Sequence, residues 1–192
     1  MTTIVYLHGF RSSPASIKAT QLRDAVHALA APPQLYVPAL EHRPARAIAH
    51  VVEWIERNAD TPLTFVGSSL GGFYATYLAE RFDARAVMIN PAVRPHEDLR
   101  PWLGPQTNLY TGETFVVTQE HLDELCTLAV TCITRPERYF LLVETGDEVL
   151  DFREAVAYYG GAYQYLGGGG DHTFTEFVAQ IPAILRFAGV SQ

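Results

Sequence analysis

The sequence is poor in cysteine and in positive charge. Its two cysteines, Cys126 and Cys132, are spaced neither as a CxxC redox pair nor as a zinc knuckle. Both fall in an apolar helical pattern, which predicts buried thiols that serve packing. With 14 Lys and Arg residues against 21 Asp and Glu residues, the net charge is −7, whereas nucleic-acid-binding proteins usually carry a basic patch. We therefore expect no nucleic-acid partner.

Long hydrophobic runs are absent as well. No apolar stretch approaches the roughly 18–20 residues that cross a membrane. The N-terminus leads directly into an apolar run, with no basic segment and no cleavage motif of a secretory signal. These features predict a cytoplasmic protein without a membrane span. The length of 192 residues suits one domain, residues 1–192, with a sizeable core, and the 48% of hydrophobic residues indicates a folded globular protein.

Short apolar runs alternate with helical patterns along the chain, which is typical of a parallel sheet flanked by helices. Near-continuous apolar runs indicate strands that are covered on both faces. Six strands are predicted, at residues 4–7, 35–37, 63–66, 86–89, 139–143 and 163–166. The expected fold class is therefore α/β, a three-layer α-β-α arrangement with a mostly or wholly parallel sheet of about six strands.

The helical patterns carry start signals of their own. The first helix is predicted to begin at Ser13 as N-cap, with Pro14 at its first position. The last is predicted to begin near Thr173, which has capping-box spacing to Glu176. Pro182 lies inside this last pattern and should kink or split the helix.

Residues 90–138 interrupt the alternation of strands and helices. This stretch opens with several prolines, contains no clear strand pattern, and exceeds the length of an ordinary connection between a helix and a strand. It does contain one helical pattern, whose apolar side is formed by Leu122, Leu125, Cys126, Ala129 and Ile133. We expect a crossover helix and a small cap, about residues 91–137, between the fourth strand and the fifth.

One short motif carries chemistry. Residues 67–71 read Gly-Ser-Ser-Leu-Gly and match G-x-S-x-G, with Ser69 at the centre. The motif needs glycine on both sides of the serine because the chain turns sharply from a strand into a helix. A predicted strand precedes Ser69 and a helical pattern follows it, as the motif requires. Ser69 is therefore the predicted nucleophile.

A serine nucleophile needs a base and an acid that orients this base. His172 follows the last predicted strand and the four-glycine run 167–170, and it is the predicted base. Three carboxylates follow the preceding strand: Asp147 is the favoured acid, Glu148 and Asp151 remain alternatives, and Asp151 also suits a helix N-cap. His27, His50 and His121 fall in helical patterns and are predicted on the surface, while His42 and His96 lie in loops that can approach the site.

Acyl transfer also needs backbone amides directed at the oxyanion. The predicted donors are the amides of Leu70, which follows the nucleophile, and Phe10, which follows Gly9 after the first strand. His8 is expected to support this loop. Three residues are weaker candidates for substrate binding, on position alone: Ser13, Trp102 and Tyr110.

Five motifs in this order resemble the bacterial YqiA-type esterases, which are small α/β hydrolases with little or no lid. They are Tyr-Leu-His-Gly-Phe-Arg-Ser-Ser-Pro from residue 6, Gly-Ser-Ser-Leu-Gly-Gly-Phe-Tyr-Ala from 67, Asn-Pro-Ala from 90, Thr-Gly-Asp-Glu-Val-Leu-Asp from 145 and Gly-Gly-Asp-His from 169. The order Ser69, Asp147, His172 is also that of α/β hydrolases. The resemblance implies that fold, without its N-terminal antiparallel hairpin, and the roles of nucleophile, acid and base for these three residues.

The resemblance further implies hydrolysis of short-chain aryl esters, extending to acyl-CoA thioesters, without a metal or cofactor. The expected partner is thus a small-molecule ester or thioester, and the expected state is a monomer or small homo-oligomer. Two alternatives stay open. The fold can serve ligand binding with little or no catalysis, or the triad can perform amidase or lyase chemistry.

Overall fold

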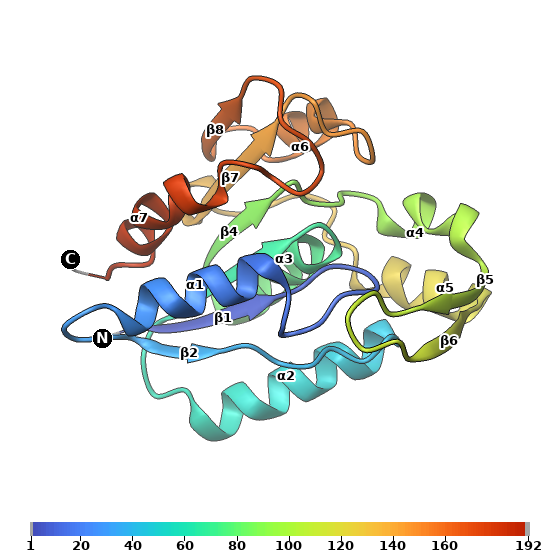
Figure 1. Cartoon of the computed structure of the whole chain (residues 1–192), viewed down its shortest axis with the longest axis horizontal. Coiled ribbons are helices and arrows are strands. Elements are labelled where there is room, and N and C mark those ends of the chain that lie inside the picture. The colour runs from blue at the N-terminus through green and yellow to red at the C-terminus, as the bar shows by residue number, and fades with distance from the viewer. Residues whose placement is uncertain (1, 191–192) are drawn as a thin grey trace.

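The computed structural model of the protein describes residues 2–190. Its centre is a six-stranded sheet in the order β2-β1-β3-β4-β7-β8, in which all neighbouring strands are parallel (Figure 1). The six strands lie where the sequence predicts them: β1 (Thr3–Leu7), β2 (Gln34–Tyr36), β3 (Leu63–Ser68), β4 (Arg85–Ile89), β7 (Tyr139–Glu144) and β8 (Tyr163–Gly167). The predicted three-layer α/β fold is confirmed.

Helices cover both faces of this sheet. One face carries α1 (Ile17–His27) and α7 (Phe177–Phe187), and the other carries α2 (Pro44–Asn58), α3 (Leu70–Phe82) and α6 (Phe152–Tyr158). Side chains alternate between the two cores: Tyr6 packs with α1 and α7, whereas Val5 and Leu7 pack with α2 and α3. Each fully buried aliphatic side chain contributes about 1.5–3 kcal/mol by leaving water.

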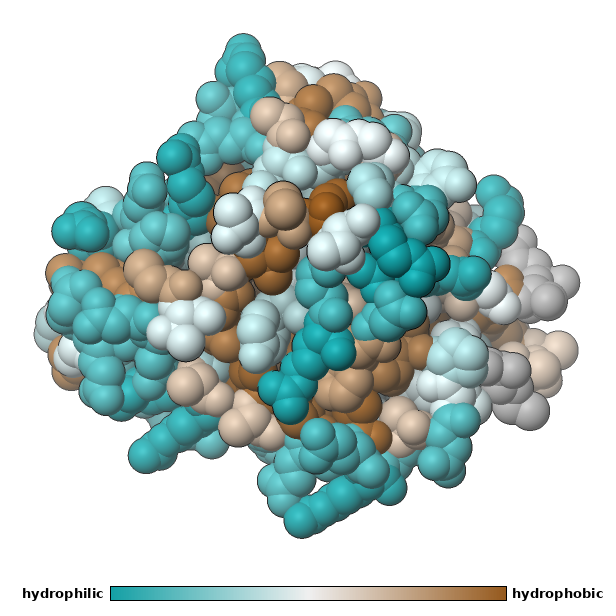
Figure 2. Space-filling model, turned by 180° about the vertical axis from the view of Figure 1, so that it is seen from behind, coloured by the Kyte–Doolittle hydropathy of each residue, from teal (hydrophilic) through white to brown (hydrophobic). Residues whose placement is uncertain are grey.

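The view from behind shows a surface in which hydrophilic residues surround patches of hydrophobic residues (Figure 2). Helix α2 has one apolar side, which it turns towards the sheet. This side is formed by residues that recur at helical spacing and are all buried: Ile48, Val51, Val52 and Ile55. Among residues 2–190, no helix is both long and apolar enough to cross a bilayer.

The stretch between β4 and β7 contains more structure than its sequence pattern predicts. It forms α4 (Pro95–Asp98), the 3-10 turn η1 (Arg100–Trp102), the strands β5 (Gly104–Thr107) and β6 (Thr114–Val117), α5 (Gln119–Leu128) and the 3-10 turn η2 (Pro136–Arg138). The antiparallel hairpin β5–β6 was not predicted, because each strand has only four residues and β5, Gly-Pro-Gln-Thr, contains no apolar run.

Helix α5 also differs from its prediction. It ends at Leu128 because Ala129 has an extended backbone, so Ala129 and Ile133 are not part of it. Its buried side is formed by His121, Leu122, Leu125 and Leu128. Cys126 is not among these buried positions and Cys132 lies beyond the helix. Both cysteines are exposed, so the prediction of buried thiols was wrong.

Two predicted helix starts were wrong as well. Helix α1 begins at Ile17, after Ser16, whereas Ser13 Oγ accepts a hydrogen bond from the Ala15 amide and closes the preceding turn. Helix α7 begins at Phe177, because Phe174 has a φ of +59° that no right-handed helix accepts. It continues through Pro182 and is not split.

Candidate active site

Ser69 lies at the sharp turn between β3 and α3, with a φ of +56°. For a residue other than glycine, such a backbone stores about 1–3 kcal/mol of strain, which the surroundings must hold in place. Here the Ser69 amide donates to the Ile89 carbonyl at 3.0 Å. A Cβ atom on Gly67 or on Gly71 would lie 2.0 Å from a backbone oxygen, so both glycines of the motif are required by close approach.

The structure brings Ser69, His172 and Asp147 together. These residues follow β3, β8 and β7, and the carboxyl ends of parallel strands meet at one edge of a sheet. His172 Nε2 lies 3.1 Å from Ser69 Oγ, and its Nδ1 lies 2.9 Å from Asp147 Oδ2 and 3.0 Å from Oδ1. The three side chains therefore form one hydrogen-bonded chain in the order acid, imidazole, hydroxyl.

Asp147 is fixed from two directions. Its side chain is 2% exposed, and Oδ1 also accepts hydrogen bonds from the amides of Val149 and Leu150, each at 2.9 Å. Burial raises the pKa of this carboxyl, but the hydrogen bonds from His172 and the two amides outweigh burial, so the pKa lies below its ordinary value. Asp147 is consequently ionised at neutral pH.

The two other carboxylates of this loop have different partners. Asp151 caps α6, as its sequence context suggested, and accepts a hydrogen bond from the Arg153 amide at 3.0 Å. Glu148 accepts from the backbone amide of His172 at 3.0 Å and does not bond to the imidazole. Neither of them occupies the position that Asp147 takes beside His172.

Sequence reasoning missed Glu144, the last residue of β7. Its carboxylate is 1% exposed and accepts four hydrogen bonds from the segment that carries His172: from the amides of Asp171, Thr175 and Glu176 and from the hydroxyl of Thr175, at 2.8–3.0 Å. Burial raises the pKa of Glu144, but these bonds lower it below its ordinary value. The available signal was a single acid at the end of an apolar strand.

Asn90 supports the same segment from the end of β4. Its Oδ1 accepts a hydrogen bond from the Glu144 amide at 3.0 Å, and its Nδ2 donates to the carbonyls of Asp171 and His172 at 3.0 and 3.3 Å. The backbone of Asn90 has a φ of +39°, a region that asparagine tolerates better than most residues. Glu144 and Asn90 thus hold the His172 backbone from two neighbouring strands.

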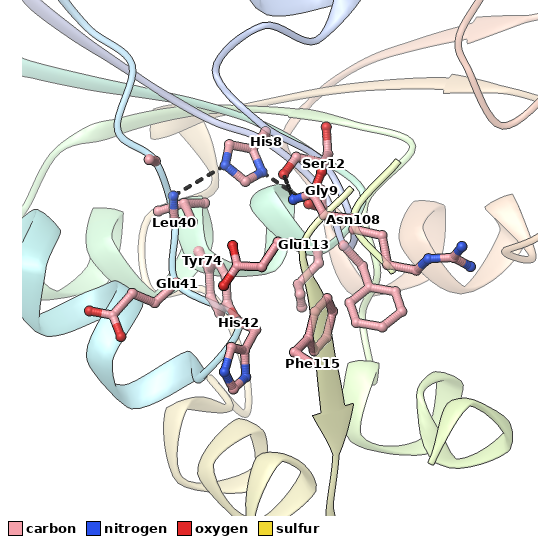
Figure 3. Close-up of a pocket in the computed structure, with 14 residues that line it drawn as sticks. His8, Gly9, Ser12, Leu40, Glu41, His42, Tyr74, Asn108, Glu113 and Phe115 are labelled. Carbon is pink, nitrogen blue, oxygen red and sulfur yellow. Dashed lines mark hydrogen bonds between the residues drawn. The ribbon is translucent and has the colours of Figure 1, made fainter. Parts of the chain in front are cut away.

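Two cavities lie on either side of the loop that follows β1. The serine cavity, of about 370 Å³, is lined by Ser69 and His172 together with Lys18, Leu109 and Tyr110. The hairpin cavity, of about 300 Å³, is lined by Phe10, Leu70 and Tyr74 and by Glu113 and Phe115 of the β5–β6 hairpin (Figure 3). Gly9, Phe10 and Ser12 line both cavities, so this loop is the wall between them.

The remaining predicted residues take different places. Phe10 and Leu70 both line the hairpin cavity, and within residues 2–190 neither of their amides donates a hydrogen bond to another residue. Tyr110 lines the serine cavity. Trp102 packs edge-on against Phe10, at 6.2 Å between ring centroids, and lines neither cavity. Ser13 is buried and also lines neither cavity.

The histidines also separate into groups. His8 supports the loop as expected, since its Nε2 accepts from the Leu40 amide at 3.2 Å and its Nδ1 lies 3.0 Å from the Gly9 carbonyl (Figure 3). His42 lines the hairpin cavity, whereas His96 lines neither cavity. His121 was predicted on the surface but is buried, because it completes the capping box of α5 and lies 2.9 Å from His42.

Over the described part of the chain, no three side chains of His, Cys, Asp or Glu are grouped so that they could hold a metal ion.

The model of the uncharacterised protein family UPF0227 matches residues 3–189. Similar solved structures include a presumed hydrolase from Agrobacterium vitis S4, with 18% identity over 97% of this chain and 87% of that one and a TM-score of 0.78. Mouse alpha/beta hydrolase domain-containing protein 10 is 16% identical over 97% and 89%, with a TM-score of 0.73. The esterase domain of a Rhodothermus marinus protein is 17% identical over 97% and 85%, with a TM-score of 0.66. At these identities, the likeness establishes the α/β-hydrolase fold.

Proposed function

The chain belongs to the YqiA-like family UPF0227, and on this premise we propose that it is a serine esterase that hydrolyses carboxylic esters through Ser69, His172 and Asp147. The observation that carries the proposal is the hydrogen-bonded chain from Asp147 through His172 to the hydroxyl of a strained Ser69. A serine hydroxyl becomes nucleophilic when a neighbouring imidazole takes its proton. The esterase domain among the similar structures agrees with this chemistry.

In the first half of the reaction, Ser69 Oγ attacks the ester carbonyl while its proton moves to His172 Nε2. The ionised Asp147 stabilises the imidazolium through Nδ1. The negative charge of the tetrahedral intermediate falls on the carbonyl oxygen, which accepts hydrogen bonds from the amides of Phe10 and Leu70. His172 then returns the proton to the leaving oxygen, and the acyl group stays on Ser69.

The second half repeats these steps with water. His172 takes a proton from a water molecule, whose oxygen attacks the acyl carbonyl, and the same two amides hold the oxyanion. The Ser69–acyl bond breaks as His172 returns the proton to Oγ. The products are a free carboxylic acid and the original enzyme, so no cofactor enters the balance.

The proposal extends to thioesters such as acyl-CoA, whose carbonyl reacts by the same steps. We further propose that residues 91–137 act as a small cap within a single domain, because the β5–β6 hairpin of this segment lines one of the two cavities beside Ser69.

A fluorophosphonate probe tests the nucleophile directly, because it labels only activated serines. The wild type should be labelled and the Ser69→Ala variant should not, and equal labelling of both would overturn the proposal. A parallel panel of aryl esters, acyl thioesters and anilides then assigns the bond type. Ester cleavage that is lost with Ser69 supports the esterase, whereas faster anilide cleavage would replace it with an amidase.

A further inference from the structure

The proposed general acid is exposed to only one of the two cavities on either side of the loop that follows β1. His172 lines the serine cavity and does not line the hairpin cavity. Because His172 must protonate the leaving oxygen, the alcohol part of an ester has to lie on its side of Ser69. The acyl part then extends past the amides of Phe10 and Leu70 on the other side of the carbonyl. Leu70 lines the hairpin cavity and not the serine cavity, whereas Phe10 lines both and stands between them.

The hairpin cavity contains negative charge that no cation among residues 2–190 neutralises closely. Figure 3 shows the Glu113 side chain reaching into the cavity from the hairpin, while the Glu41 carboxylate lies at its outer edge. Within residues 2–190, the Glu113 carboxylate makes neither an ion pair nor a hydrogen bond. Glu41 has only a loose ion pair with Arg46, at 3.8 Å, on the protein surface.

Arg11 also lines this cavity, but its guanidinium is engaged elsewhere. Its Nε donates to the Thr107 carbonyl at 2.8 Å, and its Cζ lies 5.5 Å from the centre of the Trp102 ring. Trp102 does not line the cavity, and among residues 2–190 no ion pair joins Arg11 to Glu113. The charge that a ligand meets in the hairpin cavity is therefore negative.

Tyr74 gives a second, independent indication of a ligand. This residue lines the hairpin cavity and is 2% exposed, yet its hydroxyl has no hydrogen-bonding partner among residues 2–190. Its oxygen is not among the fully enclosed polar atoms of the described residues, so it is accessible and can accept a hydrogen bond from a ligand in the cavity. His42, which also lines this cavity, is fixed by stacking on Phe115, with ring centroids 4.9 Å apart, and by its contact with His121.

We propose that the hairpin cavity is the acyl-binding site and that it takes an acyl group ending in a protonated amine, with Glu113 as counter-ion and the Tyr74 hydroxyl as acceptor. An ammonium group supplies three N–H donors, which suit one carboxylate and one unpartnered hydroxyl oxygen. This assignment rests on the proposed function, because the position of the acyl group follows from the role of His172. The substrate class is thus esters of amino-substituted carboxylic acids.

Three esters with one leaving group test this assignment: 4-nitrophenyl 6-aminohexanoate, the nearly isosteric 4-nitrophenyl heptanoate, and the mono-4-nitrophenyl ester of hexanedioic acid. The wild type should show its highest kcat/KM on the amino ester and its lowest on the acidic one. Glu113→Gln should lower the ratio of kcat/KM between amino ester and heptanoate about threefold to tenfold. Tyr74→Phe, which deletes only the hydroxyl, should lower the same ratio.

Glu53→Gln is the matched control. Glu53 is an exposed residue of α2 that lines neither cavity, and its substitution removes the same charge, so the ratio should stay that of the wild type. A wild-type ratio at or below one, or equal ratios for Glu113→Gln and Glu53→Gln, would overturn the acyl-site assignment while leaving the esterase intact. Absence of any Ser69-dependent ester cleavage would instead overturn the proposed function, and the assignment with it.

Discussion

Asp147 performs two tasks with one carboxylate. It bonds to His172 Nδ1, and it closes the turn through the amides of Val149 and Leu150. Asp147→Asn keeps an oxygen for the two amides but directs N–H donors at the imidazole, which favours the wrong tautomer of His172. We expect kcat on an aryl ester to fall roughly 10³- to 10⁴-fold with little change in fold. Steady-state kinetics and circular dichroism measure the two effects.

Asp151→Asn is the natural companion to that variant. It changes the same functional group four residues later, where the carboxylate caps α6 and does not contact His172. Its kcat should stay close to that of the wild type, because asparagine also serves as an N-cap. Should Asp151→Asn lose activity while Asp147→Asn retains it, the acid has been assigned to the wrong residue.

Glu144 is a positioning residue whose effect reaches Ser69 through the His172 backbone. Glu144→Gln places an amide N–H₂ among groups that are all donors, so at least one buried bond is lost. We expect the free energy of unfolding at pH 7 to fall by about 1–3 kcal/mol and kcat to fall with it, while KM changes less. Urea denaturation and steady-state kinetics provide the readouts.

The pH dependence of the stability lost in Glu144→Gln shows whether the negative charge of Glu144 contributes to it. The pKa of Glu144 in the folded protein lies below its ordinary value of 4.5, so its contribution to stability is complete above pH 4.5 and is lost as the pH falls through the folded pKa. The stability difference between wild type and Glu144→Gln should therefore shrink in acid. A constant difference from pH 7 down to pH 4 would show that the charge of Glu144 is unimportant.

At the scale of elements, the glycine run between β8 and His172 offers a matched pair of substitutions. Gly170 has a φ of +68°, and a Cβ atom there would lie 1.9 Å from Glu144 Oε2. Gly168 has open space around the same position and no positive φ. Gly170→Ala should therefore lower both stability and kcat, the latter at least tenfold, whereas Gly168→Ala should alter neither strongly. If both variants lost stability and kcat to a similar extent, the loop would require flexibility in general, and the positive φ and close approach at Gly170 would not be what matters.

The strands and the serine turn could be predicted because their signals are local. An apolar run marks each buried parallel strand, and the glycines around Ser69 mark a turn without room for side chains. The start of α7 could not be predicted, since the +59° φ of Phe174 reflects the packing of its ring in the core. The role of Glu144 depends on bonds to residues 27–32 positions later, which no local pattern encodes.

At the scale of the whole molecule, α5 attaches the segment after β4 to α2. Arg43, just before α2, pairs with Glu124 and with Glu120 at 2.7 Å, and the Ala45 amide donates to Glu124 at 3.1 Å. Beside these charges, His42 and His121 share one hydrogen bond. The Thr118 amide donates to His121 Nδ1, so the neutral His121 ring must donate from Nε2 to His42 Nδ1. Protonation of either ring would place two donors against each other.

This attachment should weaken as the pH falls. Burial, and then the neighbouring His42 and Arg43, lower the pKa of His121 below its ordinary value of 6.5, although Glu124 and Glu120 act in the opposite direction. The unfolded chain therefore binds a proton that the folded chain excludes, and stability is lost progressively as the pH falls below about 6.5. His121→Asn keeps an acceptor for Thr118 but cannot titrate. Urea denaturation should show a smaller loss between pH 7.5 and 5.5 for this variant than for the wild type.

The loss should not disappear entirely in His121→Asn, because burial also lowers the pKa of His8, which contributes in the same direction. His50→Asn is the control, since His50 is an exposed residue of α2 and its substitution should leave the wild-type loss unchanged. If the wild type and His121→Asn lose equal stability over this range, protonation of His121 does not govern the attachment of α5. A smaller loss only in His121→Asn would identify neutral His121 as a condition for holding α5 against α2, beside the hairpin cavity.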